Sequence, residues 1–200
     1  MNEENQELVK GIADAISARD IGMLDYYVRQ AATYCFKESQ LDQGAFSRDI
    51  FSLIISLMDD PKFLEMEGSH HLLIIFEYDW GILLEEQKME LLQAIRRSYE
   101  KYRETMSYFV ISELLGEYYC NEASYQVLCE LQSTANEAAR YFIQHGFEHI
   151  AKDANNPHLR KRALSSLSAM KNDKSSKVRN EVDESLSNLR IRGIDTNLSR

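Results

Sequence analysis

Apolar residues recur every three or four positions along almost the whole chain, and this spacing constrains the fold more than any other feature. Residues spaced in this way fall on one stripe of an α-helix. Only 2 prolines and 8 glycines occur in 200 residues, too few for a turn-rich β-sandwich or barrel. One apolar run, residues 72–76, also suits a buried strand, but no second run is present to pair with it. We therefore expect an all-α protein.

Short polar residues and prolines mark where these helices begin. Asp60 and Asn156 each precede a proline, which suits the first position of a helix. Thr134 and Glu137 have the spacing of a capping box, and Gly146 predicts a helix end or kink. The helices expected from these signals are 4–18, 21–36, 47–58, 69–79, 84–102, 105–119, 122–132, 134–151, 157–170 and 176–190.

Helix pairs in the second half of the chain begin near residues 85, 121 and 156, which is the period of a helical solenoid. We expect stacked antiparallel helix pairs, either a HEAT-like α-solenoid or an irregular helical bundle. The expected organisation is a single all-α domain over 1–190, with an irregular helical part over 1–84, HEAT-like helix pairs over 85–190 and a C-terminal tail over 191–200.

The last expected helix carries a residue pattern that resembles the second helix of a HEAT repeat. The residues that carry it are Asp173, Val178, Arg179, Val182 and Leu186. The resemblance covers roughly the last two helices, and it implies that the aspartate and the arginine brace successive repeats. Two features depart from the family pattern: no proline stands shortly before Val178, and Val182 replaces the commoner alanine.

Charge is distributed unevenly along the chain. The formal net charge is −9, and residues 1–150 carry 26 acidic and 12 basic side chains against 6 and 11 in residues 151–200. An acidic surface repels phosphate backbones, so we expect no nucleic-acid partner. The absence of a long apolar run and of a leader-like N-terminus predicts no membrane partner and a cytoplasmic location. The three cysteines imply no disulfide framework.

One motif points to metal chemistry. His145, Glu148 and His149 fit the H-x-x-E-H pattern of inverted zinc peptidases, in which two histidines four apart on a helix hold the metal. Gly146 weakens that helix, and the following residues offer no recognisable third ligand. A helix terminus or kink explains the same residues without a metal. The chain also has no glycine-rich phosphate loop and no nucleophile elbow. We therefore expect neither an enzyme nor a cofactor.

A tyrosine-rich acidic segment predicts a protein-binding surface. Six of the 11 tyrosines fall between residues 99 and 125, and residues 104–150 carry seven acidic side chains and a single basic one. Tyrosine is enriched in protein interfaces, and surrounding carboxylates orient a cationic partner. The same residues would also suit half-buried core edges with a solvated acidic surface. The residues expected to contact a partner are Glu113, Glu117, Tyr118, Tyr119, Glu122 and Tyr125.

The segment from Phe109 to Tyr119, followed by the HEAT-like end, looks similar to helical immunity proteins of bacterial polymorphic-toxin systems. This resemblance implies a protein that binds and neutralises a cognate cationic toxin domain. A nuclease toxin would suit best, because its site must be basic. The alternatives are a HEAT-like scaffold or adaptor without inhibition, and a zinc-dependent hydrolase that uses the H-x-x-E-H motif. The oligomeric state stays open.

Overall fold

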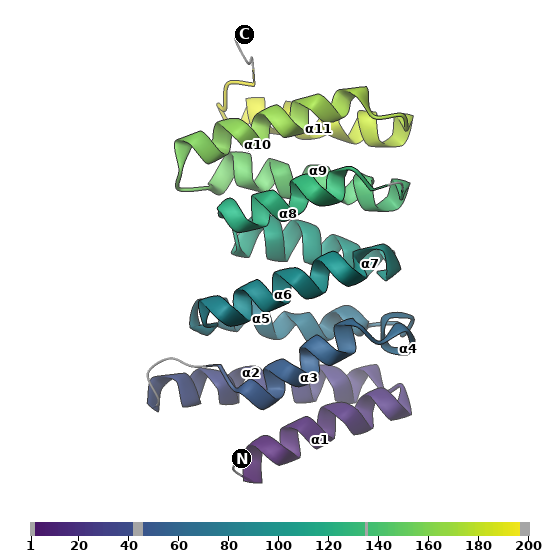
Figure 1. Ribbon diagram of the computed structural model, residues 1–200, viewed down its shortest axis with the longest axis vertical. Coiled ribbons are helices and arrows are strands. Elements are labelled where there is room, and N and C mark those ends of the chain that lie inside the picture. The colour runs from purple at the N-terminus through teal and green to yellow at the C-terminus, as the bar shows by residue number, and fades with distance from the viewer. Residues whose placement is uncertain (1–2, 42–45, 135, 197–200) are drawn as a thin grey trace. The chain divides into compact units, whose positions relative to one another are not determined.

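The structure is a computed structural model that describes residues 3–41, 46–134 and 136–196 (Figure 1). This described part of the chain contains helices and no strand, which confirms the all-α prediction. The chain forms two compact units, Met1–Met106 and Ser107–Arg200. The expectation of one domain over 1–190 stays a prediction.

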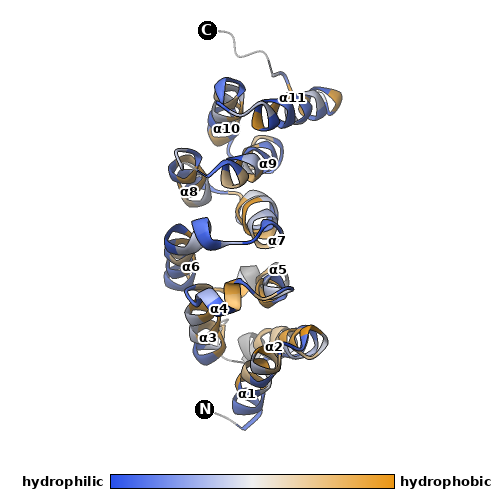
Figure 2. Cartoon of the chain, turned by 90° about the vertical axis from the view of Figure 1, so that its right-hand side faces the viewer, coloured by the Kyte–Doolittle hydropathy of each residue, from blue (hydrophilic) through white to orange (hydrophobic). Residues whose placement is uncertain are grey.

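The first unit stacks its helices in two layers. In Figure 2, α3 and α6 lie on one side and α2 and α5 on the other, while α1 packs against both α2 and α3. Residues 69–79 are helical, so the apolar run at 72–76 is a buried helix as expected. The elements are α1 (Glu3–Ala18), α2 (Ile21–Leu41), α3 (Arg48–Met58), α4 (Pro61–Leu64), η1 (Ser69–Leu73), α5 (Ile74–Asp79), η2 (Trp80–Ile82), α6 (Glu85–Ser98) and η3 (Tyr99–Lys101).

The second unit has the same two-layer plan. On one side lie α8 and α10, and on the other lie η4, α9 and α11, with α9 in contact with all four of these other helices (Figure 2). The boundary between the units falls within α7 (Glu104–Tyr108). The remaining elements are η4 (Phe109–Tyr118), α8 (Glu122–Gln132), α9 (Glu137–Asp153), α10 (Pro157–Ala169), η5 (Met170–Asn172) and α11 (Ser176–Ile191).

Side-chain bonds between successive helix pairs join residues about forty positions apart. In the second unit, Tyr125 bonds Ser166 and Tyr141 bonds Glu181, at separations of 41 and 40 residues. In the first unit, Arg97 bonds Asp59 across 38 residues. A constant interval of this kind indicates that equivalent positions of neighbouring helix pairs face each other, as in a helical repeat. The helical repeat-like prediction is thereby confirmed.

Most predicted helix starts agree with the structure, and one does not. The side chains of Asp60 and Asn156 accept hydrogen bonds from the first backbone N–H groups of α4 and α10. The prediction of a capping box at Thr134 and Glu137 is wrong. Asn136 caps α9 instead, since its carboxamide oxygen accepts from Ala138 and Ala139 at 3.0 and 3.3 Å. Asn136 directly precedes the helix, so its short polar side chain reaches the first free backbone N–H groups.

The predicted break at Gly146 is also wrong, because α9 runs unbroken from Glu137 to Asp153. The glycine serves close packing. A Cβ on Gly116 of η4 would lie 3.1 Å from the Gly146 Cα, and a Cβ on Gly146 would lie 2.9 Å from the Leu128 side chain. Gly116 therefore allows η4 to approach the α9 backbone, and Gly146 leaves room for the Leu128 side chain of α8.

The segment expected as an α-helix over 105–119 is largely a π-helix. After α7, residues 109–118 form the i→i+5 bonds of a π-helix. Each turn then holds one residue more than an α-helical turn, so residues five apart share a face. On an α-helix, residues five apart would point about 140° apart. The change of register decides which side chains of η4 gather on the surface.

A buried ion pair ties α9 to the start of α11. The Arg140 Nε donates to Asp173 Oδ2 at 2.8 Å, and the two side chains are 5% and 10% exposed. Arg140 also donates to the Thr134 carbonyl, while Asp173 accepts from the Ser175 backbone N–H. Asp173 therefore braces successive helix pairs through its ion pair with Arg140. Arg179 bonds the backbone carbonyl of Asp173 rather than its carboxylate.

We expect Arg140→Ala to lower the free energy of unfolding by about 3 kcal/mol, because it leaves the Asp173 carboxylate buried without its partner. Urea denaturation of the purified protein measures this. The matched control is Lys10→Ala, which removes an exposed ion pair with Asp14 (side chains 76% and 65% exposed) and should change the value by less than about 0.5 kcal/mol. Equal effects of the two substitutions would contradict the bracing role.

The same pair predicts a pH dependence of stability. Burial opposes the charged form of Asp173, but the hydrogen bonds from Arg140 and Ser175 outweigh it and lower the pKa of Asp173. A depressed folded-state pKa stabilises the fold above the unfolded pKa, about 3.9, and this contribution disappears as the pH falls through the folded-state value. The stability difference between the wild type and Asp173→Asn should be constant from about pH 7 to 5 and shrink in stronger acid. A difference that grows in acid would contradict it.

Candidate functional site

The outer side of α9 presents three polar side chains in helical register. Tyr141, His145 and Glu148 follow one another at intervals of four and three residues, so they share one face of the helix. This face is flanked by η4 on one side and by α11 on the other. The three helices therefore bring together side chains from distant parts of the second unit.

His145 lies between two carboxylates. Its Nε2 is 3.4 Å from Glu181 Oε1 of α11, and its Nδ1 is 3.8 Å from Glu148 Oε2 of its own helix. The Tyr141 hydroxyl donates to the other Glu181 oxygen at 3.0 Å. These bonds fix Glu181 at the seam between α9 and α11.

Glu148 remains a carboxylate although it is largely buried. Burial raises its pKa. The hydrogen bonds from His145 and Ser185 and the charges of the nearby histidines lower the pKa by more than burial raises it, so the pKa of Glu148 lies below its ordinary value. The Ser185 hydroxyl is 2.5 Å from Glu148 Oε2 and also bonds the buried Gln144 carboxamide. The site therefore holds negative charge at neutral pH.

Tyr108, the last residue of α7 and the N-cap of η4, extends this surface toward η4. Its side chain is 44% exposed, and its ring contacts Phe142 and His145 edge-on, with centroids 6.0 and 6.3 Å apart. Burial raises the pKa of Tyr108, and the charges of Glu113 and Glu117 raise it further. Because the π-helical register aligns residues five apart, Glu113 and Tyr108 lie on the same side of η4.

We call this surface the acidic face. It comprises Tyr108, Glu113, Glu117, Tyr141, His145, Glu148 and Glu181. Within the described residues, no lysine or arginine forms an ion pair with any of its four carboxylates. One cation lies beside it, because the Lys177 Nζ sits 4.4 Å from the centroid of the Tyr141 ring. The face thus combines uncompensated carboxylates with aromatic rings.

The six residues predicted to contact a partner do not form one surface. Glu113 and Glu117 belong to the acidic face. Tyr118 is half-buried at the end of η4, and Tyr119 is only 6% exposed. Both tyrosines therefore lie close to Glu117 in the sequence, but neither adds a largely exposed ring to the acidic face.

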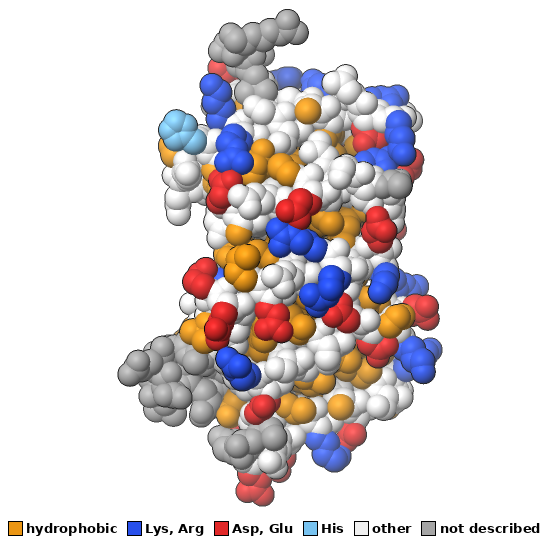
Figure 3. Space-filling model, in the orientation of Figure 1, with side chains coloured by type: hydrophobic (Ala, Val, Ile, Leu, Met, Phe, Trp, Pro, Cys, Tyr) orange, Lys and Arg blue, Asp and Glu red, His pale blue; other side chains and the backbone are white. Residues whose placement is uncertain are grey.

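Glu122 and Tyr125 lie in the opposite layer, on α8. Arg162 of α10 donates from Nη1 to both Glu122 carboxylate oxygens at 2.8 Å, and its guanidinium lies 4.5 Å from the centroid of the Tyr125 ring. Tyr125 is 7% exposed. Figure 3 shows the side on which α8 and α10 lie in front, and acidic and basic side chains are interspersed there. Glu122 and Tyr125 therefore join α8 to α10.

Sequence reasoning missed Tyr108, Tyr141 and Glu181 as members of the site. Tyr141 and His145 are spaced four apart, and Lys177 and Glu181 are also spaced four apart. The signal that would have united them is the interval of about forty residues between facing positions. The bond between Tyr141 and Glu181 spans this interval.

The H-x-x-E-H residues do not converge on one point. His145 faces Glu148 and Glu181, whereas the Nδ1 of His149 lies 3.7 Å from Asp153. Among the described residues, no group of three or more His, Cys, Asp or Glu side chains is arranged to hold a metal ion. The geometry gives the zinc-hydrolase alternative no support.

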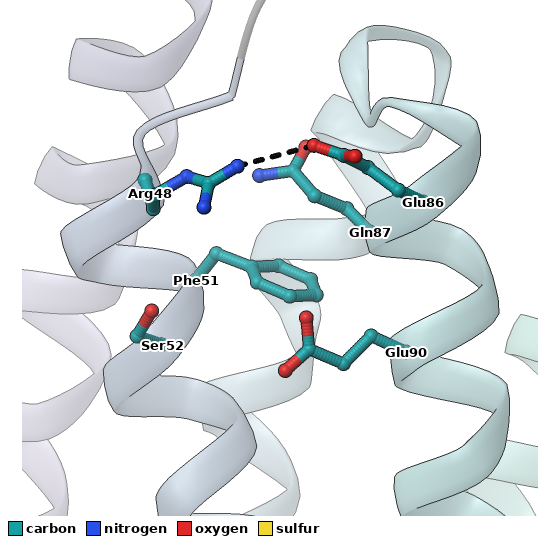
Figure 4. Close-up of a pocket in the computed structure, with 6 residues that line it drawn as sticks. All are labelled: Arg48, Phe51, Ser52, Glu86, Gln87 and Glu90. Carbon is teal, nitrogen blue, oxygen red and sulfur yellow. Dashed lines mark hydrogen bonds and ion pairs between the residues drawn. The ribbon is translucent and has the colours of Figure 1, made fainter.

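Two pockets lie among the described residues of the first unit. One of about 180 Å³ lies between α3 and α6. There Arg48 pairs with Glu86 at 3.1 Å and the Phe51 ring forms the floor (Figure 4). Another of about 380 Å³ lies beside Gly68 and Arg103, where Arg103 donates to the Glu65 carbonyl.

Comparison with protein-family models, curated proteins and solved structures finds no match to this chain. In the part of the chain that the structure describes, every helix is too short or too polar to cross a bilayer.

We predict that zinc does not stabilise the protein, because His145 and His149 point to different carboxylates. The melting temperature should be the same with and without an excess of zinc, and zinc bound after gel filtration should be far below one ion per chain. His145→Ala with His149→Ala serves as the control and should behave like the wild type. Stoichiometric zinc that disappears in this double variant would revive the hydrolase hypothesis.

Proposed function

We propose that the chain is a non-enzymatic protein-binding protein whose acidic face docks on a cationic surface of another protein. The observation that carries this proposal is the gathering of four carboxylates and two tyrosines on η4, α9 and α11, without an arginine or lysine ion pair to those carboxylates among the described residues. On the opposite layer the chain supplies its own arginine to Glu122. The asymmetry between the layers favours the acidic face as the side that meets a partner.

The chemistry of the face fits an interface. Tyrosine gives a large contact area with few rotatable bonds, so little conformational entropy is lost when it is covered. Uncompensated carboxylates raise the association rate of a cationic protein and disfavour acidic competitors. Such binding weakens as salt rises, because exposed charges are screened over about 8–10 Å at physiological ionic strength.

We further propose that the helix pairs of the second unit are HEAT-like. Support comes from the Asp173 brace between α9 and α11 and from the interval of 40 and 41 residues between bonded positions. HEAT-like stacks present continuous helical layers to their partners. A surface spread over three helices of one layer is the kind of interface that such a stack offers.

The class of partner follows from charge together with the sequence resemblance to helical immunity proteins. A toxin that cleaves nucleic acid needs a basic substrate path, because its substrate is a polyanion. Carboxylates on the acidic face would occupy that path in place of phosphates. We therefore propose a cytoplasmic immunity protein that binds and neutralises a cationic, nuclease-type toxin domain.

The test begins with the partner. The chain, carrying an affinity tag, is expressed in its native cells, and the protein retained at low salt is identified and purified. Reversing two charges, Glu113→Lys with Glu117→Lys, should weaken its binding at least tenfold by calorimetry, since two attractive charges become repulsive. The matched control is Glu7→Lys with Glu90→Lys, which makes the same charge change on exposed residues of the first unit.

Equal loss in both double variants would show that only the net charge matters and would contradict the role of the acidic face. Inhibition is tested separately. The partner alone should arrest growth of a host cell, and co-expression of the wild-type chain, but not of the Glu113→Lys, Glu117→Lys variant, should restore it. A harmless partner that binds the same face would support a scaffold and refute the immunity role.

A further inference from the structure

We propose that Tyr108, Glu113 and Glu117 form a binding site for an arginine side chain of the partner. This inference names the group that the acidic face recognises, and it rests on the proposed function only for the source of that arginine. It is carried by a comparison within the chain. The second unit already binds its own Arg162 with a tyrosine ring and a glutamate, and it holds Lys177 over a second tyrosine ring whose hydroxyl bonds a glutamate.

The first internal example is a complete arginine site. Arg162 lies over the Tyr125 ring, with its Cζ 4.5 Å from the centroid, and its Nη1 donates to both oxygens of Glu122 at 2.8 Å. The ring attracts the cation through its negative face, and the carboxylate receives the N–H groups. Ring and carboxylate come from one helix, α8, at positions three apart.

The second example holds a lysine. The Lys177 Nζ lies 4.4 Å from the centroid of the Tyr141 ring, and the Tyr141 hydroxyl donates to Glu181 at 3.0 Å. The ring and the carboxylate are here on different helices, α9 and α11, and the cation is one turn from the carboxylate on α11. Tyrosine rings therefore hold cations in two separate surroundings of this fold, and at Tyr125 a glutamate completes the site.

Tyr108, the last residue of α7 and the N-cap of η4, forms another group of a tyrosine ring and glutamates. Its ring is 44% exposed, Glu117 is exposed and Glu113 is half-buried. Both carboxylates act on the Tyr108 hydroxyl, because their charges add to burial in raising its pKa. No lysine or arginine of the described chain is paired with either carboxylate. A cation for this combination has to come from another molecule.

The π-helix explains why these three side chains are together. Tyr108 and Glu113 are five residues apart and Glu113 and Glu117 are four apart. One turn of a π-helix spans between about four and five residues. Side chains at either interval therefore project from the same side of η4. The Tyr108 ring is held in place by its edge contacts with Phe142 and His145.

Arginine suits this site better than lysine or a metal ion. A guanidinium is planar, stacks on an aromatic ring and offers several N–H groups to two carboxylates at once, whereas an ammonium acts as a compact, strongly hydrated charge. Metal binding has no support, since the described residues show no cluster with the donors that an ion needs. Recognition of a single exposed arginine also fits a nuclease-type partner, whose surface is rich in this residue.

The test uses a defined probe, N-acetyl-argininamide, titrated into the isotope-labelled full chain and followed by NMR. We expect saturable shifts at Tyr108 and along residues 109–117, and a binding constant at least about fivefold weaker in Glu113→Gln with Glu117→Gln. N-acetyl-lysinamide should bind this site more weakly than the arginine probe. Tyr108→Leu should lose the selectivity for arginine while the protein keeps its dispersed spectrum.

The chain supplies its own positive control. Arg162→Ala removes the internal arginine from Tyr125 and Glu122, so the probe should then also shift these two residues. Probe binding at Tyr125 in this variant without any at Tyr108 would overturn the proposal. So would shifts spread equally over all exposed carboxylates, or shifts that the Glu113→Gln, Glu117→Gln variant leaves unchanged.

This experiment separates the two proposals. An arginine site at Tyr108 in a chain whose captured partner ignores the charge reversal would uphold the site and refute the docking function. A partner that depends on Glu113 and Glu117, with no detectable preference for the arginine probe, would uphold docking and refute recognition of arginine.

Discussion

The backbone contact between η4 and α9 is the constraint on which the second unit depends. Gly116 and Gly146 face each other so closely that a Cβ on Gly116 would come within 3.1 Å of the opposite Cα. Where the two helices approach in this way, apolar side chains of both are completely buried, Ile111 and Phe147 among them. With both helices fixed, the register of η4 decides which polar side chains remain outside.

The helix α9 connects this packing to function. Its first turn is tied to the next helix pair by the buried pair of Arg140 and Asp173, and its middle and last turns carry His145 and Glu148 on the acidic face. Buried charge is therefore paired within the fold, while Glu113 and Glu117 of η4 form no ion pair with a lysine or arginine of the described residues. A desolvated charge needs a partner, and Asp173 has one within the fold in Arg140.

The sequence predicted the helices well because amphipathic stripes and capping residues act locally. Asn156 marks the start of α10 and the stripe from Val178 to Leu189 marks α11, as the structure confirms. The site was harder to predict. Glu117 and Glu122 are neighbours in sequence but belong to opposite layers, and Tyr108 joins Glu113 only because η4 is a π-helix. A search for periods of 3.6 residues cannot detect a register that is set by tertiary packing.

A site-specific titration of Tyr108 tests the centre of this account most directly. Its pKa, measured from the ring carbon shifts by NMR, should lie above the ordinary value of about 10 for tyrosine. It should fall when Glu113→Gln and Glu117→Gln remove the two negative charges, and it should not move with Glu122→Gln. A Tyr108 pKa indifferent to Glu113 and Glu117 would place the carboxylates away from the ring and contradict both the register and the binding site.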